Sequence, residues 1–347
     1  MGVAKNEPMT QQRRVSLGLI FVGLLFICVG RVAMVGPHLM ALNQPNHTNG
    51  LRAQFASMNA LQLDRYSREQ ARIPWLIHQS WKSVDKIPAR FEPWMRSWRE
   101  LNPQWQYVFW TDDDNLAIFE HVYPQYLYIA KALSKIALAD MARYALLHHF
   151  GGLYADADFE CVQPFGGLHE EYELFLSSEP RAHAVLLEGS DSPALCNALM
   201  ASAPGHPFWV QVLESIKAKF DTESESDPVS LTGPRIVKST YYGGFENDTR
   251  VAVLPPTYFY PEIAYWNRGN LLEKCKDRND TAGKEVCAWL EQYPDGEFTE
   301  KTHATHHWQC TWCRGAGDET VTLSSIFPTS VYRPSFNQSN NGPKLVV

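Results

Sequence analysis

The chain has 347 residues, of which 45% are hydrophobic and 12% aromatic, enough apolar material for one large or two ordinary domains with a buried core. This composition excludes a lone small module and wholesale disorder. The formal net charge is −7 and no basic cluster interrupts the chain, so the electrostatic footprint of nucleic-acid binding is absent. We therefore expect no nucleic-acid partner.

The N-terminal region carries a membrane signal. Residues 15–36 are apolar or small, with Arg31 as the only charge, and this run reaches the ~20 residues that a helix needs to cross a bilayer. Two arginines and a lysine precede it, which favours a cytosolic tail over residues 1–14. The pattern predicts a single-pass type II signal anchor with a lumenal body. The alternative is a cleaved signal peptide, whose apolar region is usually shorter and followed by a small-residue cleavage site.

Sequons and cysteines agree with a lumenal, glycosylated body. Four N-x-S/T sequons have no proline in the middle; they are Asn46, Asn247, Asn279 and Asn337. Six cysteines follow the apolar run, an even number that permits disulfides in an oxidising compartment. Six cysteines allow 15 pairings, among which the sequence does not choose. We favour Cys275 with Cys287, because they are close in sequence and separated by charged, loop-like residues.

Composition divides the rest of the chain into three parts. Residues 37–70 are polar and weakly periodic, which is typical of a stem. Residues 71–336 alternate short apolar runs with longer helical ones, which predicts one α/β domain with helices covering a sheet. Within it, the acidic stretch 221–227 reads as a solvated loop. Residues 337–347 form a polar tail.

A helix and a strand follow one another in the middle of the domain. Apolar residues recur at spacings of three and four over residues 134–150, which predicts an amphipathic helix ended by two glycines. Asp140 and Arg143 then share one face of that helix. Residues 153–159 alternate with period two, as a strand does, so Asp156 and Asp158 project to one side at its carboxyl end.

The two aspartates form a D-x-D sequence, for which several interpretations exist. The carboxyl end of such a strand is where open α/β sheets bind ligands, and two carboxylates there suit Mg²⁺ or Mn²⁺ bridging a diphosphate. A solvated turn is the simplest alternative for the tripeptide alone. A calcium loop is rejected, since Cys161 and Gly167 occupy the positions that need Gly and Glu. A glycosidase pair is disfavoured, because two side chains on one strand face do not flank a scissile bond.

Residues 134–159 resemble the signature of family 32 glycosyltransferases, which are retaining enzymes with a GT-A-like fold. The resemblance spans most of residues 73–312, in the family's order; it is carried by residues 73–82, 102–114, 134–159, 231–234 and 304–312. It implies a GT-A-like nucleotide-diphospho-sugar transferase domain, preceded here by the N-terminal transmembrane helix.

The resemblance also implies roles for individual residues. Asp156 and Asp158 match the motif that holds Mn²⁺ (or Mg²⁺) on the donor diphosphate, and His306 matches the residue that completes the metal site. Asp140 and Arg143 match the catalytic pair that contacts the transferred sugar. The alternative for this pair is an exposed ion pair worth only a few tenths of a kcal/mol.

Two tryptophans receive donor-binding roles from the resemblance. Trp81 matches the position whose ring stacks on the nucleotide base, and Trp312 matches a contact near the diphosphate. The alternative for Trp81 is a core position, because several other tryptophans crowd the same region. The turn at residues 232–234 matches a family motif and has either a structural role or an acceptor contact. The triple aspartate at residues 112–114 is interpreted as a helix N-cap and first turn rather than a second metal site.

The C-terminal cluster at residues 303–313 allows a second interpretation. His303, His307, Cys310 and Cys313, together with the neighbouring His306, have the types and spacings of a zinc site. Zinc ribbons and fingers usually bring two Cys-x-x-Cys pairs, however, and only one is present. Cys310 and Cys313 depart from the family pattern, and we expect either a local disulfide or two unreactive thiols.

The sequence therefore predicts a Golgi type II membrane glycosyltransferase that is metal-dependent and, by resemblance, retaining. Similarity to fungal Golgi mannosyltransferases favours GDP-mannose as donor. We expect a glycan acceptor, because the relatives that act on ceramide usually carry extra apolar helices near the C-terminus and the sequence shows none. The alternatives are an inositol-phosphoceramide (glycolipid) mannosyltransferase and a transferase that uses a UDP-sugar. A different class, a non-catalytic membrane-tethered carbohydrate-binding protein, is disfavoured by the intact D-x-D with its Asp140–Arg143 pair.

Overall fold

The computed structural model describes most of the chain after residue 71. The described ranges are residues 72–223, 227–311 and 319–328, and the backbone of 336–337, 340–341 and 345–346. They all belong to one compact unit, Gln44–Val347. The predicted cytosolic tail, anchor and stem lie outside the described residues. Of the helices within the described ranges, none has the length and apolar character needed to span a bilayer.

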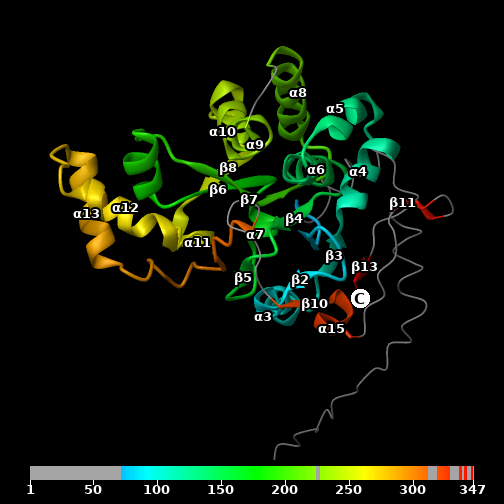
Figure 1. Ribbon diagram of the computed structural model, residues 1–347, viewed down its shortest axis with the longest axis horizontal. Coiled ribbons are helices and arrows are strands. Elements are labelled where there is room, and N and C mark those ends of the chain that lie inside the picture. Colours follow the sequence, from blue (N-terminus) through cyan, green and yellow to red (C-terminus); the bar gives the residue numbers. More distant parts are fainter. Residues whose placement is uncertain are drawn as a thin grey trace, which may run out of the picture. The chain divides into compact units, whose positions relative to one another are not determined.

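A seven-stranded mixed sheet forms the centre of the unit (Figure 1). Its spatial order is β13 (Leu345–Val346), β3 (Gln106–Trp110), β1 (Leu76–Ser80), β4 (Gly152–Ala155), β7 (Leu195–Ser202), β6 (Leu174–Ser178) and β8 (Val251–Leu254). Strand β1 is parallel to β3 and β4, β7 is antiparallel to β4 and β6, and β8 is parallel to β6. The carboxyl ends of β3, β1, β4 and β6 therefore meet at one edge of the sheet.

Helices cover both faces of this sheet, each over its own apolar core (Figure 1). One core contains α4 (Asp112–His121), α5 (Leu127–Ala132), α6 (Lys135–Phe150), α8 (Pro207–Thr222) and α10 (Pro234–Thr240). The other contains α3 (Glu92–Leu101), α7 (Leu168–Glu171), α11 (Pro256–Phe259) and α15 (Leu323–Ile326). The predicted α/β class is thereby confirmed. Other short elements include α9 (Pro228–Leu231) and the strand pairs β2 (Ile87–Pro88) with β10 (Thr320–Val321) and β11 (Phe336–Asn337) with β12 (Asn340–Asn341).

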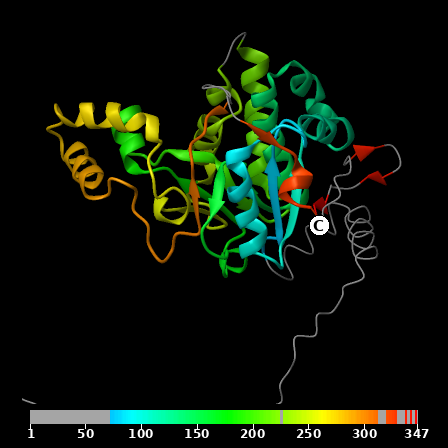
Figure 2. The same cartoon turned by 60° about the horizontal axis from the view of Figure 1, so that its bottom comes forward.

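A third apolar cluster lies beside the sheet, where α12 (Arg268–Cys275) and α13 (Thr281–Gln292) pack on a π-helix at His183–Glu188. Figure 2 shows the two helices, in yellow and orange, side by side. The predicted disulfide between Cys275 and Cys287 is confirmed. The connecting loop is shorter than expected, because Cys287 lies inside α13.

Helix α6 is correctly predicted in its bounds, but the prediction of an exposed face is wrong. The Ser134 hydroxyl caps its first turn, and Gly151 ends it at φ 65°. A side chain at Gly151 would collide with Pro204, so only glycine fits. The helix is buried on nearly every side between residues 137 and 147, because it lies between the sheet and α8. Asp140 and Arg143 are 7% and 4% exposed, which excludes the surface ion pair.

The predicted continuous strand over residues 153–159 is also wrong. Strand β4 ends at Ala155, and β5 begins only at Phe159 and extends to Cys161. The Asp156 N–H donates to the Ala198 carbonyl, and the Phe159 N–H donates back to the Asp156 carbonyl. These two bonds turn the chain, so the D-x-D sequence forms a turn at the edge of the sheet. Strand β5 then pairs with β9 (Ala304–His306) instead of with the main sheet.

Two predicted helix starts are confirmed. Thr111 caps α4: its hydroxyl oxygen accepts the Asp114 N–H at 3.4 Å, and Asp114 Oδ2 accepts the Thr111 backbone N–H at 2.9 Å, which together form a capping box. Helix α10 begins at Pro234, directly after Gly233. A side chain at Gly233 would meet the backbone of Val229 at 2.9 Å, so this glycine has a structural role. Of the acidic stretch at 221–227, the first two residues end α8 and residues 224–226 lie outside the described ranges.

Candidate active site

The candidate site lies at the edge where the parallel strands end. Asp156 directly follows β4, and its backbone carbonyl accepts a hydrogen bond from the Gln79 amide at 3.0 Å. Gln79 is fully buried in β1, where it also accepts the Tyr107 hydroxyl. The side-chain hydroxyl of Tyr154 donates to Asp156 Oδ1 at 3.0 Å. The first aspartate of the motif is therefore held by three strands of the sheet.

Arg143 joins this aspartate to α6. Its Nη1 lies 3.2 Å from Asp156 Oδ1, and its Nη2 lies 3.0 Å from Asp140 Oδ1. The same Nη1 donates to the Asn197 carbonyl at 2.8 Å, and the guanidinium lies 4.7 Å from the centre of the Tyr154 ring. One cation thus bridges the predicted sugar-binding residue and the predicted metal ligand.

Asp140 is the most enclosed carboxylate of the site. It accepts the Asn197 side-chain amide at 2.9 Å and the Thr232 hydroxyl at 3.5 Å. The Tyr144 hydroxyl, which accepts from the same Asn197 amide, donates to the Thr232 carbonyl at 2.6 Å. Burial raises the pKa of Asp140 to about 6, although Arg143 opposes this shift. The Asp140 carboxylate therefore takes up a proton at a pH only slightly below neutral.

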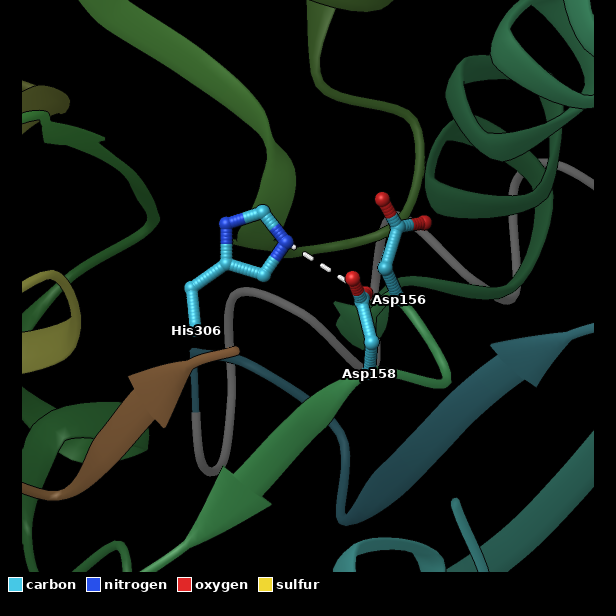
Figure 3. Close-up of side chains that lie close together, drawn as sticks. All are labelled: Asp156, Asp158 and His306. Carbon is cyan, nitrogen blue, oxygen red and sulfur yellow. Dashed lines mark ion pairs between the residues drawn. The ribbon is translucent and has the colours of Figure 1, made fainter. Parts of the chain in front are cut away.

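The second aspartate of the motif faces a histidine from the far end of the domain (Figure 3). His306, the last residue of β9, places its Nε2 at 3.3 Å from Asp158 Oδ1. Burial alone would raise the pKa of Asp158, but His306 beside it lowers that pKa. Burial likewise opposes the imidazolium, and Asp158 raises the pKa of His306 in spite of it. The predicted partnership of these two residues is therefore present in the structure.

Asp156, Asp158 and His306 form a candidate metal-binding group. Each offers one ligand atom, and these atoms all lie within 4.8 Å of one another. Two carboxylate oxygens with one imidazole nitrogen are hard to borderline donors, which suit Mn²⁺ or Mg²⁺ better than soft metals. The other carboxylate oxygen of Asp158 is anchored by the Gln309 N–H at 2.7 Å, as expected of a fixed ligand. The residues present therefore fit a divalent cation.

The zinc interpretation of the C-terminal cluster is not supported. His303 Nδ1 lies 2.7 Å from the Pro164 carbonyl, and His307 Nε2 lies 2.9 Å from Glu160 Oε2. The His307 ring also stacks on Trp94. Cys310 is disulfide-bonded, which excludes it as a thiolate ligand, and Cys313 lies outside the described residues. The histidines are thus directed at separate partners, and only His306 joins the candidate metal group.

Of the two predicted donor-binding tryptophans, Trp81 and Trp312, the structure describes only Trp81. Trp81 follows β1 at the same edge as Asp156, half-buried, with its ring edge against Phe91 at 5.1 Å. Its indole N–H donates to the Lys86 carbonyl at 2.7 Å. Trp81 therefore lies at the edge of the sheet, where it packs against the apolar core without being buried in it. Trp312 lies outside the described residues.

Several polar residues of the site have no role predicted from the sequence, among them Asn197, Tyr154 and Gln309. Asn197 lies in β7, whose residues are all buried, so no alternation or motif marks it. Tyr154 was placed on the strand but given no role, although its hydroxyl binds Asp156. Gln309 contributes its backbone N–H, and the amino-acid sequence does not show which backbone N–H groups bind a side chain.

Comparison with known proteins identifies the class of this site. Residues 88–175 match the family model described as "Glycosyltransferase sugar-binding region containing DXD motif". This range includes Asp140, Arg143 and both aspartates of the turn. These residues thus lie in the segment of the chain that matches the DXD sugar-binding region of glycosyltransferases, and the resemblance noted in the sequence is confirmed.

Individual relatives are fungal mannosyltransferases. The chain is 31% identical over 153 residues to inositol phosphoceramide mannosyltransferase 3 of Schizosaccharomyces pombe, covering 44% of this chain and 39% of that protein. It is 24% identical to the initiation-specific alpha-1,6-mannosyltransferase of Candida albicans, covering 59% and 61% of the two chains. The chain thus spans less than two thirds of these relatives. Among solved structures, the PaToxG glycosyltransferase gives a TM-score of 0.40 at 16% identity, covering 71% of this chain and 95% of that one.

Proposed function

We propose that this protein is a metal-dependent, retaining glycosyltransferase of GT-A type that transfers mannose from GDP-mannose to a glycan. The observation that carries the proposal is the continuous charged network in which Arg143 bridges Asp140 to Asp156, beside the group of Asp156, Asp158 and His306. A sugar-binding pair and a diphosphate-binding group must be adjacent in such an enzyme, because the bond to be broken lies between sugar and phosphate. The named relatives favour mannose as the transferred sugar.

Two groups of residues at this edge of the sheet would have separate roles, one in metal binding and one in sugar binding. Asp156, Asp158 and His306 would hold Mn²⁺ or Mg²⁺, which when bound neutralises charge that develops on the leaving diphosphate. Asp140 and Arg143 offer a carboxylate and a guanidinium to the sugar hydroxyls, and Asn197 and Thr232 fix the Asp140 carboxylate in place. Rigid placement of the sugar is where such a site gains rate, because orientation alone supplies several kcal/mol.

A glycolipid acceptor is the second candidate. The observation that favours it is the similarity to several inositol phosphoceramide mannosyltransferases, at 29–31% identity over 42–44% of this chain. The two candidates share the donor and differ in the acceptor, so the same site serves both. The alternative to GDP-mannose as donor is a UDP-sugar.

The test is donor turnover followed by acceptor choice. The full-length protein, purified in detergent with Mn²⁺, is expected to release GDP from GDP-mannose faster than it releases UDP from UDP-glucose or UDP-galactose. Transfer is then compared between an α-mannose oligosaccharide and inositol phosphoceramide in mixed micelles. The matched control is Asp158→Asn, in which release should fall to background. Release that is equal in this control, or a preference for the UDP-sugars, contradicts the proposal.

We also propose a Golgi membrane location with the catalytic part in the lumen. The support is the apolar run at residues 15–36 with its basic flank, together with the four sequons and a disulfide. Alkali-washed membranes should retain the full-length protein, and glycosidase treatment should increase its gel mobility. Recovery only as a soluble secreted form that starts after residue 37 would contradict the anchor.

A further inference from the structure

Trp308 has an unusual backbone conformation next to the candidate metal group. Its φ is 53°, and among the described residues it is the only non-glycine residue with a positive φ. Large side chains avoid this left-handed region, because the Cβ atom approaches the backbone too closely. Such conformations persist where the surrounding structure enforces them, and they are concentrated at functional sites.

The conformation of Trp308 directs two backbone donors at one aspartate. The His307 N–H, on one side of Trp308, donates to the Asp158 carbonyl at 3.0 Å. The Gln309 N–H, on the other side, donates to Asp158 Oδ2 at 2.7 Å. In extended backbone, the N–H groups of His307 and Gln309 would point in parallel directions and would contact two different residues. The left-handed residue between them turns the chain so that both reach Asp158.

The side chain of Trp308 packs on His306, the imidazole member of the candidate metal group. Its ring centre lies 4.3 Å from that of His306, and Tyr260 lies 5.8 Å from it. Its indole N–H donates to the Glu262 carbonyl at 3.3 Å, and the residue is 9% exposed. Phe159 stacks on the imidazole with 4.6 Å between the ring centres. The His306 ring therefore packs against two aromatic side chains, those of Trp308 and Phe159.

We propose that Trp308 is a positioning residue for the metal group: its left-handed backbone fixes the Asp158 carboxylate, and its ring fixes the His306 imidazole. This inference rests on the metal-dependent function proposed above. Partners that orient metal ligands typically change metal affinity by 10–100-fold when they are removed. A tryptophan that only fills space would leave the affinity of the folded protein unchanged.

Three substitutions separate backbone from ring. Trp308→Asn removes the ring and keeps a residue type that tolerates the left-handed region. Trp308→Val also removes the ring, but its β-branched side chain, which is about as large as that of asparagine, resists that region. Trp308→Phe keeps an aromatic ring over His306. The matched control is Trp289→Phe in α13, which removes an indole hydrogen bond to Glu297 and lies at a different apolar cluster of the fold.

The measurement is Mn²⁺ affinity of the full-length protein in detergent, by calorimetry and by the spin-resonance signal of free Mn²⁺, with circular dichroism to show that each variant is folded. We expect Trp289→Phe and Trp308→Phe to bind within threefold of the wild type. Trp308→Asn should bind about tenfold more weakly, and Trp308→Val more weakly still, towards a hundredfold. If Trp308→Val does not fold, the comparison of Trp308→Asn with Trp308→Phe decides the role of the ring.

The possible results are distinct. Mn²⁺ binding by the wild type with unchanged affinity in both Trp308→Asn and Trp308→Val overturns the positioning role and leaves the proposed function intact. Unchanged affinity in Trp308→Asn alone overturns the part assigned to the ring. Equal weakening in Trp308→Asn and Trp308→Val overturns the backbone part of the proposal. Absence of Mn²⁺ binding in the wild type overturns the metal-dependent function itself, and this inference with it.

Discussion

Arg143 Nη1 lies 3.2 Å from Asp156 Oδ1, and both side chains belong to the residues that the family model covers. The contact joins a helix residue to the turn that follows β4. Loss of this cation would leave three buried or half-buried carboxylates close together, those of Asp140, Asp156 and Asp158. Arg143 is therefore needed both for the fold around the site and for the charge balance within it.

Substitutions of Arg143 and Asp140 should differ in their effect on stability. Arg143→Ala should reduce the free energy of unfolding by about 3–5 kcal/mol, since it leaves uncompensated buried charge. Asp140→Asn keeps the shape of a side chain that is already easily neutralised, with a pKa of about 6. It should cost little stability, and kcat should fall about a hundredfold through lost placement of the sugar. Thermal midpoint and kcat are measured for each variant.

The control for that pair is an ion pair at the surface. Arg250 and Asp248 lie 2.7 Å apart, and Arg250 is about half exposed. Exposed pairs contribute about 0.2–1 kcal/mol, so Arg250→Ala should leave both measurements nearly unchanged. A near-normal kcat in both Asp140→Asn and Arg143→Ala would contradict the sugar-contact role.

Removing one anionic ligand should abolish most activity. Asp156→Asn or Asp158→Asn keeps the size of the side chain and removes its charge, so turnover should fall by at least about a hundredfold, or about 2.7 kcal/mol. Chelation should do the same to the wild type, with rescue by added Mn²⁺. Asp113→Asn, an exposed aspartate in the first turn of α4, is the matched control. Full activity in chelator would show that the carboxylates do not serve a metal.

Acid should destabilise the fold through His78. This fully buried ring in β1 accepts the Trp110 indole N–H at Nδ1, at 3.0 Å, and lies 2.8 Å from the Gly151 carbonyl at Nε2. Burial lowers its pKa from 6.5 to about 4, so between these values the unfolded chain binds the extra proton and the folded protein does not. The free energy of unfolding should therefore fall as the pH decreases from 6.5 towards 4, by up to about 1.4 kcal/mol per pH unit for this group.

The measurement for His78 is urea unfolding at pH 7.5, 6 and 5, beside a ring titration by nuclear magnetic resonance. Above pH 6.5 the histidine is neutral in both states and should contribute no pH dependence. Burial also lowers the pKa of His206 to about 4, and this group adds a dependence of the same sign. A His78 ring that titrates near pH 6.5 in the folded protein would contradict the assignment.

The disulfide should stabilise α12 and α13 locally. Cys275 and Cys287 are 12 residues apart, and closing a loop of about this size stabilises a protein by roughly 3 kcal/mol in the chain-entropy account. The double substitution Cys275→Ala with Cys287→Ala should lower the thermal midpoint and expose the connection at residues 276–280 to limited proteolysis. Turnover per folded molecule should stay near that of the wild type. An unchanged midpoint would show that packing alone holds these helices.

The sequence predicted which side chains come together more accurately than it predicted the backbone and the burial of the segments that carry them. Asp140, Arg143, Asp156, Asp158 and His306 all come together as predicted. The strand containing the two aspartates was predicted too long, because period-two alternation continues through the turn that Ala198 imposes from β7. The helix was predicted with an exposed face, since its many small residues mask how completely α8 and the sheet enclose it.

Other parts of the site had no local signal in the sequence. Asn197 is a polar residue in a strand whose residues are all buried and do not alternate, and its role depends on strand order, which places β7 beside β4. The backbone conformation of Trp308 depends on the pairing of β5 with β9. Both features arise from contacts between distant segments, which periodicity and spacing do not encode.

The pairing of β5 with β9 also has a consequence for biosynthesis. Asp158 and Gln309 are 151 residues apart, so a ribosome adding about 5–20 residues per second completes the second half of the site roughly 8–30 s after the first. For most of that interval the emerging chain contains the whole segment matched by the family model but lacks His306. A product that stops before His306 would therefore keep the recognisable motif without the complete candidate metal group, and under the proposed function it would fail to bind Mn²⁺.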